Sequence, residues 1–146
     1  MIRGSCACGG VRFRVDGPVL ELSSCHCSQC RKAYGSAFGT IAVVEARHFA
    51  YEQGESLISV FRHTERVRRP FCSRCGSRLP IAEPWDPLVG IPAGLLDDDP
   101  GVRSSAHIFV ASKAPWWEIT DSAPRYDAYP PGQDMNTRHR ELSRDG

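Results

Sequence analysis

Apolar and polar residues alternate in short runs along most of the chain, and Gly, Pro, Ser and Asp separate these runs. Residues 11–15 read Val, Arg, Phe, Arg and Val, a period of two that predicts a half-buried strand. Further strands are predicted at residues 19–22, 37–44, 57–61, 77–81, 88–91 and 107–110, and residues 66–71 lead directly into Cys72. Residues 31–34 could form one helical turn before Gly35, and no long segment has the period of 3.6 typical of helices. The sequence therefore predicts a mainly β fold with little helix.

The length of 146 residues is that of one domain able to bury its own core. We assign residues 1–130 to this domain, because no linker divides them. From residue 124 the chain is rich in proline and charge, and residues 131–146 are predicted to be a flexible tail. The pair Trp116-Trp117 is interpreted as closing the core rather than binding a ligand.

Basic and acidic residues nearly balance, and the formal net charge is +1. Proteins that bind nucleic acid or membrane surfaces usually carry a strong basic excess, so neither partner is expected. No apolar run approaches the roughly 18–20 residues of a membrane span, and residues 1–6 lack the apolar region of a signal peptide. The cytoplasm is therefore the expected compartment, where thiols stay reduced and clustered cysteines favour metal binding or catalysis over disulfides.

The seven cysteines fall into two pairs and one triad, which divides them into a closed set of four and an open set of three. Cys6 and Cys8 form one pair, Cys72 and Cys75 form the other, and a glycine follows each pair. Glycine permits backbone angles that direct N–H groups at thiolate sulfurs. Four thiolates complete the tetrahedron that Zn²⁺ prefers, so the two pairs predict a structural zinc site that ties distant segments together.

The triad of Cys25, Cys27 and Cys30 lies within six residues, so all three thiols can reach one metal ion with little loss of chain entropy. Three protein ligands leave a tetrahedral zinc ion one open position. Three thiolates give the centre a formal charge of about −1, which suits a fourth thiolate better than the generation of hydroxide from water. Thiolate is the nucleophilic form of sulfur, so the triad predicts addition of a bound thiol to a small electrophile rather than hydrolysis.

Two other interpretations of the triad remain open. His26 or His63 could supply a fourth ligand and close the site, although His26, between two ligands, would usually point away from their metal. Alternatively, the triad could hold no metal, with two of its thiols forming a redox disulfide. An odd number of cysteines fits poorly with a purely disulfide framework.

Three cysteine motifs follow one another along the chain. They are Cys6-Ala7-Cys8-Gly9, Cys25-His26-Cys27-Ser28-Gln29-Cys30-Arg31-Lys32 and Phe71-Cys72-Ser73-Arg74-Cys75-Gly76-Ser77. In this order they resemble the glutathione-dependent formaldehyde-activating enzyme (GFA) family, and together they are far more specific than any one of them. The similarity continues through residues 93–98 and 107–116 and covers roughly residues 4–130. The family also contains the domain of centromere protein V, so its fold is not confined to one activity.

The resemblance implies coiled, mostly antiparallel β-sheets with zinc knuckles and two zinc ions per chain. It implies a structural zinc held by Cys6, Cys8, Cys72 and Cys75 and a second, catalytic zinc held by Cys25, Cys27 and Cys30. The implied activity is that of a carbon–sulfur lyase, which condenses glutathione with formaldehyde to give S-(hydroxymethyl)glutathione.

No motif identifies the substrate pocket. The carboxylates of glutathione need basic partners, although arginines scattered on strands are more often solvated surface. The candidates are Arg31, Lys32, Arg62, Arg66, Arg68, Arg69, Arg74, Arg78 and Lys113. His63 and Tyr34 are candidates for the acid that protonates the developing alkoxide. Two other functions remain open: a zinc-stabilised binding module whose partner surface is the basic segment 62–78, and a thiol redox sensor based on the triad.

Overall fold

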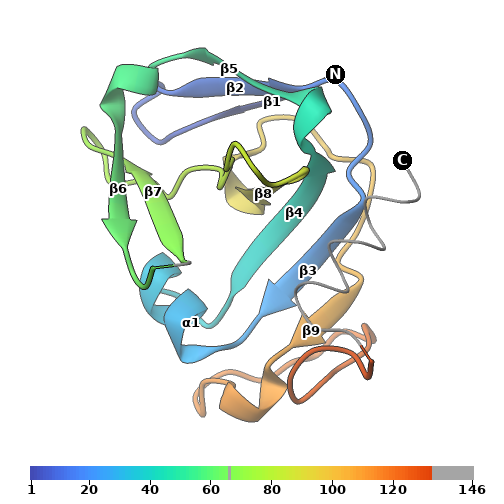
Figure 1. Ribbon diagram of the computed structural model, residues 1–146. Coiled ribbons are helices and arrows are strands. Elements are labelled where there is room, and N and C mark those ends of the chain that lie inside the picture. The colour runs from blue at the N-terminus through green and yellow to red at the C-terminus, as the bar shows by residue number, and fades with distance from the viewer. Residues whose placement is uncertain (66, 133–146) are drawn as a thin grey trace.

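The computed structural model describes residues 1–65 and 67–132, which form two β-sheets, a β-hairpin and one short α-helix (Figure 1). The first sheet has the order β1-β2-β5 and consists of β1 (Ile2–Ser5), β2 (Arg12–Val15) and β5 (Phe49–Gln53). The second has the order β8-β4-β3-β9 and consists of β3 (Glu21–Cys25), β4 (Gly39–Glu45), β8 (Leu88–Pro92) and β9 (Ala106–Ile108). The hairpin pairs β6 (Ile58–Arg62) with β7 (Arg68–Cys72), and the helix is α1 (Ser28–Tyr34). Single 3₁₀ turns occur at η1 (Ala46–His48), η2 (Glu55–Leu57), η3 (Ala93–Leu95) and η4 (Val110–Ser112).

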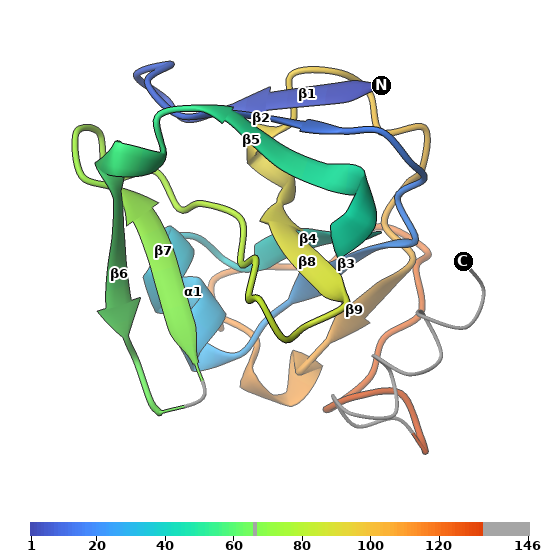
Figure 2. The ribbon, with the colours of Figure 1, turned by 45° about the horizontal axis from the view of Figure 1, so that its top comes forward.

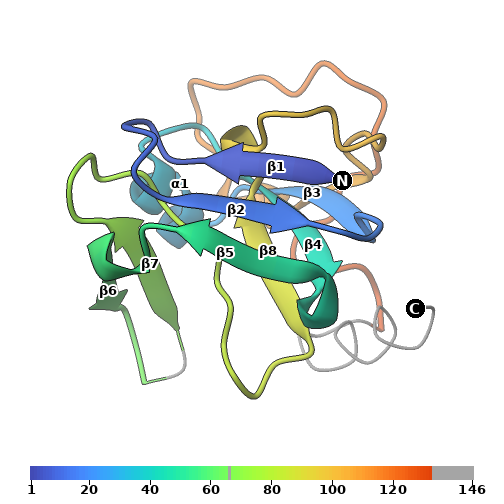
Figure 3. The same cartoon turned by 90° about the horizontal axis from the view of Figure 1, so that it is seen from above.

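The main core lies between the two sheets, which face each other in Figures 2 and 3. Phe13 and Val15 come from β2, whereas Ala42, Val44 and Ile91 come from β4 and β8. Each of these side chains is at most 1% exposed. In β2 the core residues alternate with Arg12 and Arg14, which explains the period of two at residues 11–15, whereas β4 and β8 are apolar along most of their length.

A second, smaller core joins the first sheet to the β6–β7 hairpin. It consists of Cys6, Val11, Cys72 and Leu79, all at most 4% exposed. Two of these four residues are cysteines from the predicted four-cysteine set. The cysteine pairs therefore lie where apolar burial alone is small, and a cross-link there would connect segments far apart in sequence.

The mainly β fold with little helix is confirmed. Among the described strands all pairs are antiparallel except β3 with β9. The helical turn predicted at residues 31–34 extends back to Ser28 and ends, as expected, before Gly35, whose φ of 57° is in the left-handed region. The strand predicted at 19–22 begins at Glu21 and runs on to Cys25.

Three expectations are wrong in detail. Residues 77–81 form only isolated bridges at Arg78 and Ile81, because Pro80 cannot donate to a ladder. The strand predicted at 107–110 ends at Ile108, because Phe109 adopts a left-handed φ of 56° and η4 follows. The two tryptophans do not close the core: Trp116 is 68% and Trp117 41% exposed.

The structure also contains two strands that the sequence pattern did not predict, β1 and β5. β1 is a mostly polar edge strand, and its Gly4 lies against Phe13, where a Cβ atom would come within 2.1 Å of the ring. The flexible tail predicted at residues 131–146 lies, apart from residues 131 and 132, outside the described residues. None of the helices in the described ranges is long and apolar enough to cross a membrane.

Candidate metal centres and the adjoining pocket

Cys6, Cys8, Cys72 and Cys75 form one compact group, in which the four Sγ atoms lie within 4.8 Å of one another. The Sγ atoms of Cys6 and Cys8 are 3.5 Å apart, and those of Cys8 and Cys72 are 3.9 Å apart. Zinc–sulfur bonds of about 2.3 Å in a tetrahedron would separate the sulfurs by about 3.8 Å. The four thiols therefore fit a closed tetrahedral metal site.

The two turns that carry these cysteines direct N–H groups at the sulfurs. The Val11 N–H donates to the Cys6 Sγ at 3.3 Å, and a backbone hydrogen bond closes each turn, from Gly9 to Cys6 and from Gly76 to Cys72. Gly9 and Gly76 have φ of 71° and 77°, which explains why glycine follows each pair. Hydrogen bonds with the side chain and the backbone of Ser77 are the main cause that lowers the pKa of Cys75 to about 5.

The second group, Cys25, Cys27 and Cys30, lies where β3 meets α1, and its sulfurs are also within 4.8 Å of one another. Cys25 ends β3, paired with Gly39 of β4. Cys27 is the N-cap of α1, and its Sγ accepts the Cys30 N–H at 3.3 Å. The strand end and the first helical turn thus hold three thiols on one side of a short loop.

Ionisation of the triad is uneven. The hydrogen bond with Cys25 is the main cause that lowers the pKa of Cys30 to about 6; burial opposes this shift, and Cys27 and the Arg69 guanidinium add to it. The same contact with Cys30, with burial, raises the pKa of Cys25. Cys30 is therefore the thiol of this pair that ionises first, which prepares the loop to bind a cation.

His26 turns away from the triad and begins a chain of hydrogen bonds that leads from the interior to the exposed side chain of Asp121. Its Nε2 lies 2.8 Å from Nδ1 of His107, and Nε2 of His107 lies 2.9 Å from a carboxylate oxygen of Asp121. A carboxylate only accepts, so His107 donates from Nε2, and its Nδ1 accepts the Nε2–H of His26. Burial is the main cause that lowers the pKa of His26 to about 4, and the neighbouring His107 and Lys113 add to this shift. His26 is thus neutral, and its hydrogen bond to His107 anchors the loop that carries the three thiols.

We expect His107→Leu to reduce the free energy of unfolding by about 1–3 kcal/mol, because the buried N–H of His26 would lose its acceptor. Urea unfolding measures the change. Asp121→Ala, which removes an exposed side chain at the outer end of the same chain of hydrogen bonds, should have a smaller effect. Equal stability of His107→Leu and the unchanged protein would contradict this role for His107.

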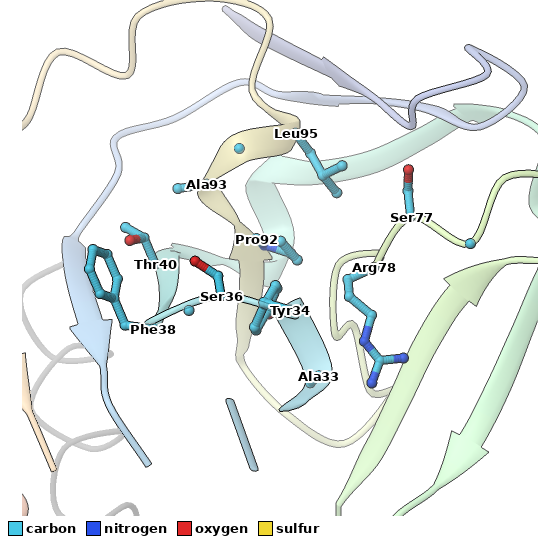
Figure 4. A pocket seen from close by; sticks show the side chains of 13 residues that line it. Ala33, Tyr34, Ser36, Phe38, Thr40, Ser77, Arg78, Pro92, Ala93 and Leu95 are labelled. Carbon is cyan, nitrogen blue, oxygen red and sulfur yellow. The ribbon is translucent and has the colours of Figure 1, made fainter. Parts of the chain in front are cut away.

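A pocket of about 480 Å³ lies beside the C-terminal end of α1, where Ala33 and Tyr34 line it (Figure 4). In Figure 4, Phe38 and Arg78 lie on opposite sides of the view, with Tyr34 between them. Tyr34 is one helical turn beyond Cys30, and its ring covers Gly39, where a Cβ atom would come within 2.5 Å of the ring. Tyr34 therefore belongs both to the pocket wall and to the surroundings of the thiols.

The donor set of both groups is sulfur alone. Among residues 1–65 and 67–132, no histidine or carboxylate joins either group, so neither His26 nor His63 is a fourth ligand to the triad within the described chain. His63 lies in the turn between β6 and β7, with its ring against Phe61. All seven cysteines are free thiols. Soft, anionic sulfur ligands in these numbers suit zinc.

The basic candidates differ in their surroundings. Arg68 forms an ion pair with Glu83 at 3.2 Å, whereas Arg69 contacts Cys30 and Arg78 lines the pocket. These three residues belong to the segment 62–78, so part of the expected partner surface faces inward.

The roles of His107 and Asp121 could not be predicted from the sequence. The two residues lie 81 and 95 residues after His26, and no motif spacing relates residues so far apart.

Comparison with known proteins identifies the family of this chain. The family model described as "Glutathione-dependent formaldehyde-activating enzyme" matches residues 1–112. A Halomonas elongata protein with a provisional name as a glutathione-dependent formaldehyde-activating enzyme is 35% identical over 131 residues, which are 82% of this chain and 81% of that protein. A crystal structure of a Rhodobacter sphaeroides protein has a similar fold, with a TM-score of 0.54 and 22% identity over 69% of this chain and 90% of that one. The chain belongs to the glutathione-dependent formaldehyde-activating enzyme family.

Proposed function

We propose that the protein is a zinc-dependent enzyme of the carbon–sulfur lyase type, which adds a thiol such as glutathione to formaldehyde or another small electrophile. The observation that carries this proposal is that three thiols gather in one place and no fourth protein ligand joins them in the described chain. Tyr34, which lies one helical turn beyond Cys30, also lines the neighbouring pocket. The family match and the name of the Halomonas relative support glutathione and formaldehyde as the substrates. Seven free thiols suit a reducing compartment, which supports the cytoplasm.

The two cysteine groups would have different tasks. Cys6, Cys8, Cys72 and Cys75 would hold a structural zinc ion, and Cys25, Cys27 and Cys30 a second one with an open position. A zinc ion held by three thiolates would supply a place where the substrate thiol loses its proton and stays a thiolate.

The reaction needs neither an oxidant nor a reductant. The substrate sulfur forms a bond to the carbonyl carbon, the π electron pair of the C=O bond moves to oxygen, and the alkoxide takes up one proton to give the hydroxymethyl thioether. Burial is the main cause that raises the pKa of Tyr34 to about 12; the charge of Cys30 adds to it, whereas Arg69 and Arg78 oppose it. The Tyr34 Oη therefore stays protonated near neutral pH and can donate to the developing alkoxide.

We expect Tyr34→Phe to lower the catalysed rate about 100-fold with little change in metal content, because it removes a proton donor and keeps the ring over Gly39. Tyr51→Phe is the matched control, since Tyr51 is also largely buried and its hydroxyl donates to the Pro80 carbonyl at 3.3 Å. An unchanged rate in Tyr34→Phe would remove Tyr34 from the mechanism.

Activity must be separated from the spontaneous addition of thiols to formaldehyde. We would measure the exchange between formaldehyde and S-(hydroxymethyl)glutathione at equilibrium by NMR with ¹³C-labelled formaldehyde. The expected result is faster exchange with the protein than with an equal concentration of Cys27→Ser protein. Equal exchange rates with the two proteins and with buffer would exclude this activity and favour a binding module.

A further inference from the structure

Arg69 and Arg78 lie on either side of the turn that contains Cys72 and Cys75. Arg69 is in β7, and Arg78 forms an antiparallel bridge with Phe71 on the return path. The Leu79 N–H donates to the Pro70 carbonyl at 3.0 Å and keeps the two segments paired. In this register Arg69 and Arg78 are diagonal neighbours on one face, close enough for long side chains to meet.

Neither Arg69 nor Arg78 has a carboxylate partner in the described part of the chain, and the acidic group beside Arg69 is the thiol of Cys30. Arg3, Arg14, Arg47, Arg68 and Arg103 each form an ion pair with a carboxylate. Within the described part of the chain, Arg69 and Arg78 form none, and the buried Nε of Arg69 has no hydrogen-bond partner. Burial, followed by the positive charge of Arg69, lowers the pKa of Arg78. Both arginines are partly exposed, and two like charges so close together repel each other, so an anion bound at Arg78 would be stabilised.

The pocket beside the pair has the size and the lining for an anionic ligand. Its volume of about 480 Å³ is within the range of small-molecule sites. Arg78 is the one charged residue among those that line it, and Tyr34, Ser36, Thr40 and Ser77 add hydroxyl groups. An arginine fork with nearby hydroxyls is the arrangement that recognises a carboxylate.

The same pair connects the pocket to the triad. Arg69 lies beside Cys30 and helps to lower its pKa, and Tyr34 interacts electrostatically with Cys25, Cys30, Arg69 and Arg78. One small molecule could therefore place a thiol at the triad and a carboxylate at Arg78.

We propose that Arg78, with Arg69 beside it, is the carboxylate-recognition site of this protein and selects thiols that carry a carboxylate within reach of the triad. The proposal rests on the proposed function for its thiol but assigns a separate group of residues to substrate selection. Glutathione has two carboxylates, on its glycine and on its γ-glutamyl residue, and both have the required chemistry.

The test is calorimetric binding of four thiols to the zinc-loaded protein. Glutathione, γ-glutamylcysteine (no glycine), glutathione monoethyl ester (glycine carboxylate masked) and cysteamine (no carboxylate) are the probes. We expect Arg78→Gln to weaken glutathione binding about ten-fold or more and cysteamine binding less than about two-fold. Arg103→Gln, an exposed arginine paired with Asp99, is the control and should change neither. If the ester binds the unchanged protein weakly, Arg78 holds the glycine carboxylate; if γ-glutamylcysteine binds like glutathione, it holds the γ-glutamyl one.

Equal weakening of glutathione and cysteamine by Arg78→Gln, or no weakening of glutathione, would overturn the proposal. If Arg78→Gln does not fold, binding to the unchanged protein still tests the proposal. The unchanged protein must then bind glutathione at least about ten-fold more tightly than cysteamine. These binding measurements are independent of turnover. If the protein selects thiols with a carboxylate but does not accelerate formaldehyde exchange, the proposed enzymatic activity is refuted and the carboxylate-recognition site stands. If it accelerates exchange but does not select such thiols, the carboxylate-recognition site is refuted and the enzymatic activity stands.

Discussion

Cys72→Ser is expected to abolish the cooperative folding of the chain. Cys72 is fully buried in the second core and belongs to the only group of four thiols in the described residues. A structural zinc site contributes about 10–16 kcal/mol of binding free energy, as large as the total stability of a typical domain of about 5–15 kcal/mol. Loss of one of its four ligands, with a hydroxyl placed in an apolar core, should therefore leave the β6–β7 hairpin unattached to the first sheet.

Near-ultraviolet circular dichroism and thermal unfolding measure this loss. We expect insoluble protein or a melt without a cooperative transition. Ser73→Ala, a change at the adjacent exposed position, is the control and should unfold like the unchanged protein. A cooperative melt of Cys72→Ser within a few degrees of the control would contradict a structural role for the four-cysteine group.

Cys27→Ser is expected to remove one metal ion and the activity while the fold persists. The triad lies in a short loop, and none of its three thiols is part of a hydrophobic core cluster. Cys27 is the N-cap of α1, and serine is among the best N-cap residues, so the hydroxyl can accept the Cys30 N–H in place of Sγ. The change thus removes a soft ligand with little disturbance of the helix.

The expected result is one zinc ion per chain where the unchanged protein has two, a melting temperature within a few degrees of it, and formaldehyde exchange at the uncatalysed rate. Elemental analysis by mass spectrometry, thermal unfolding and the NMR exchange measurement give these three quantities. Ser28→Ala at the next position is the matched control. Equal loss of folding in Cys27→Ser and Cys72→Ser would refute the division into a structural and a catalytic centre.

Local spacing explains why so much of the cysteine arrangement follows from the sequence. Cys25, Cys27 and Cys30 are so close in the chain that almost any turn brings them together, and the glycines after each pair mark the turns. Alternation in residues 11–15 likewise reports directly on burial, because Phe13 and Val15 face the core. β5 carries no such signal, because Phe49, Ala50 and Tyr51 are consecutive apolar residues that are all partly buried.

Contacts between distant segments were beyond such reasoning. His107 meets His26 because β9 pairs in parallel with β3, and no local pattern in the sequence fixes that pairing. Arg69 and Arg78 were two of nine basic candidates, and only the return of the chain after the Cys72 turn distinguishes them. Trp116 and Trp117 were expected to close the core because large aromatic residues are usually buried. In that segment, Ala114 and Ile119 are the buried residues instead.

Zinc-edge X-ray absorption during a titration with glutathione tests the two-centre arrangement most directly. One centre wrapped by four thiolates and another with three predict that added glutathione raises the average number of sulfur ligands per zinc ion, while S-methylglutathione leaves the spectrum unchanged. Four sulfurs on every zinc ion before any glutathione is added, or a spectrum that glutathione does not alter, would contradict an open sulfur-bound centre at Cys25, Cys27 and Cys30.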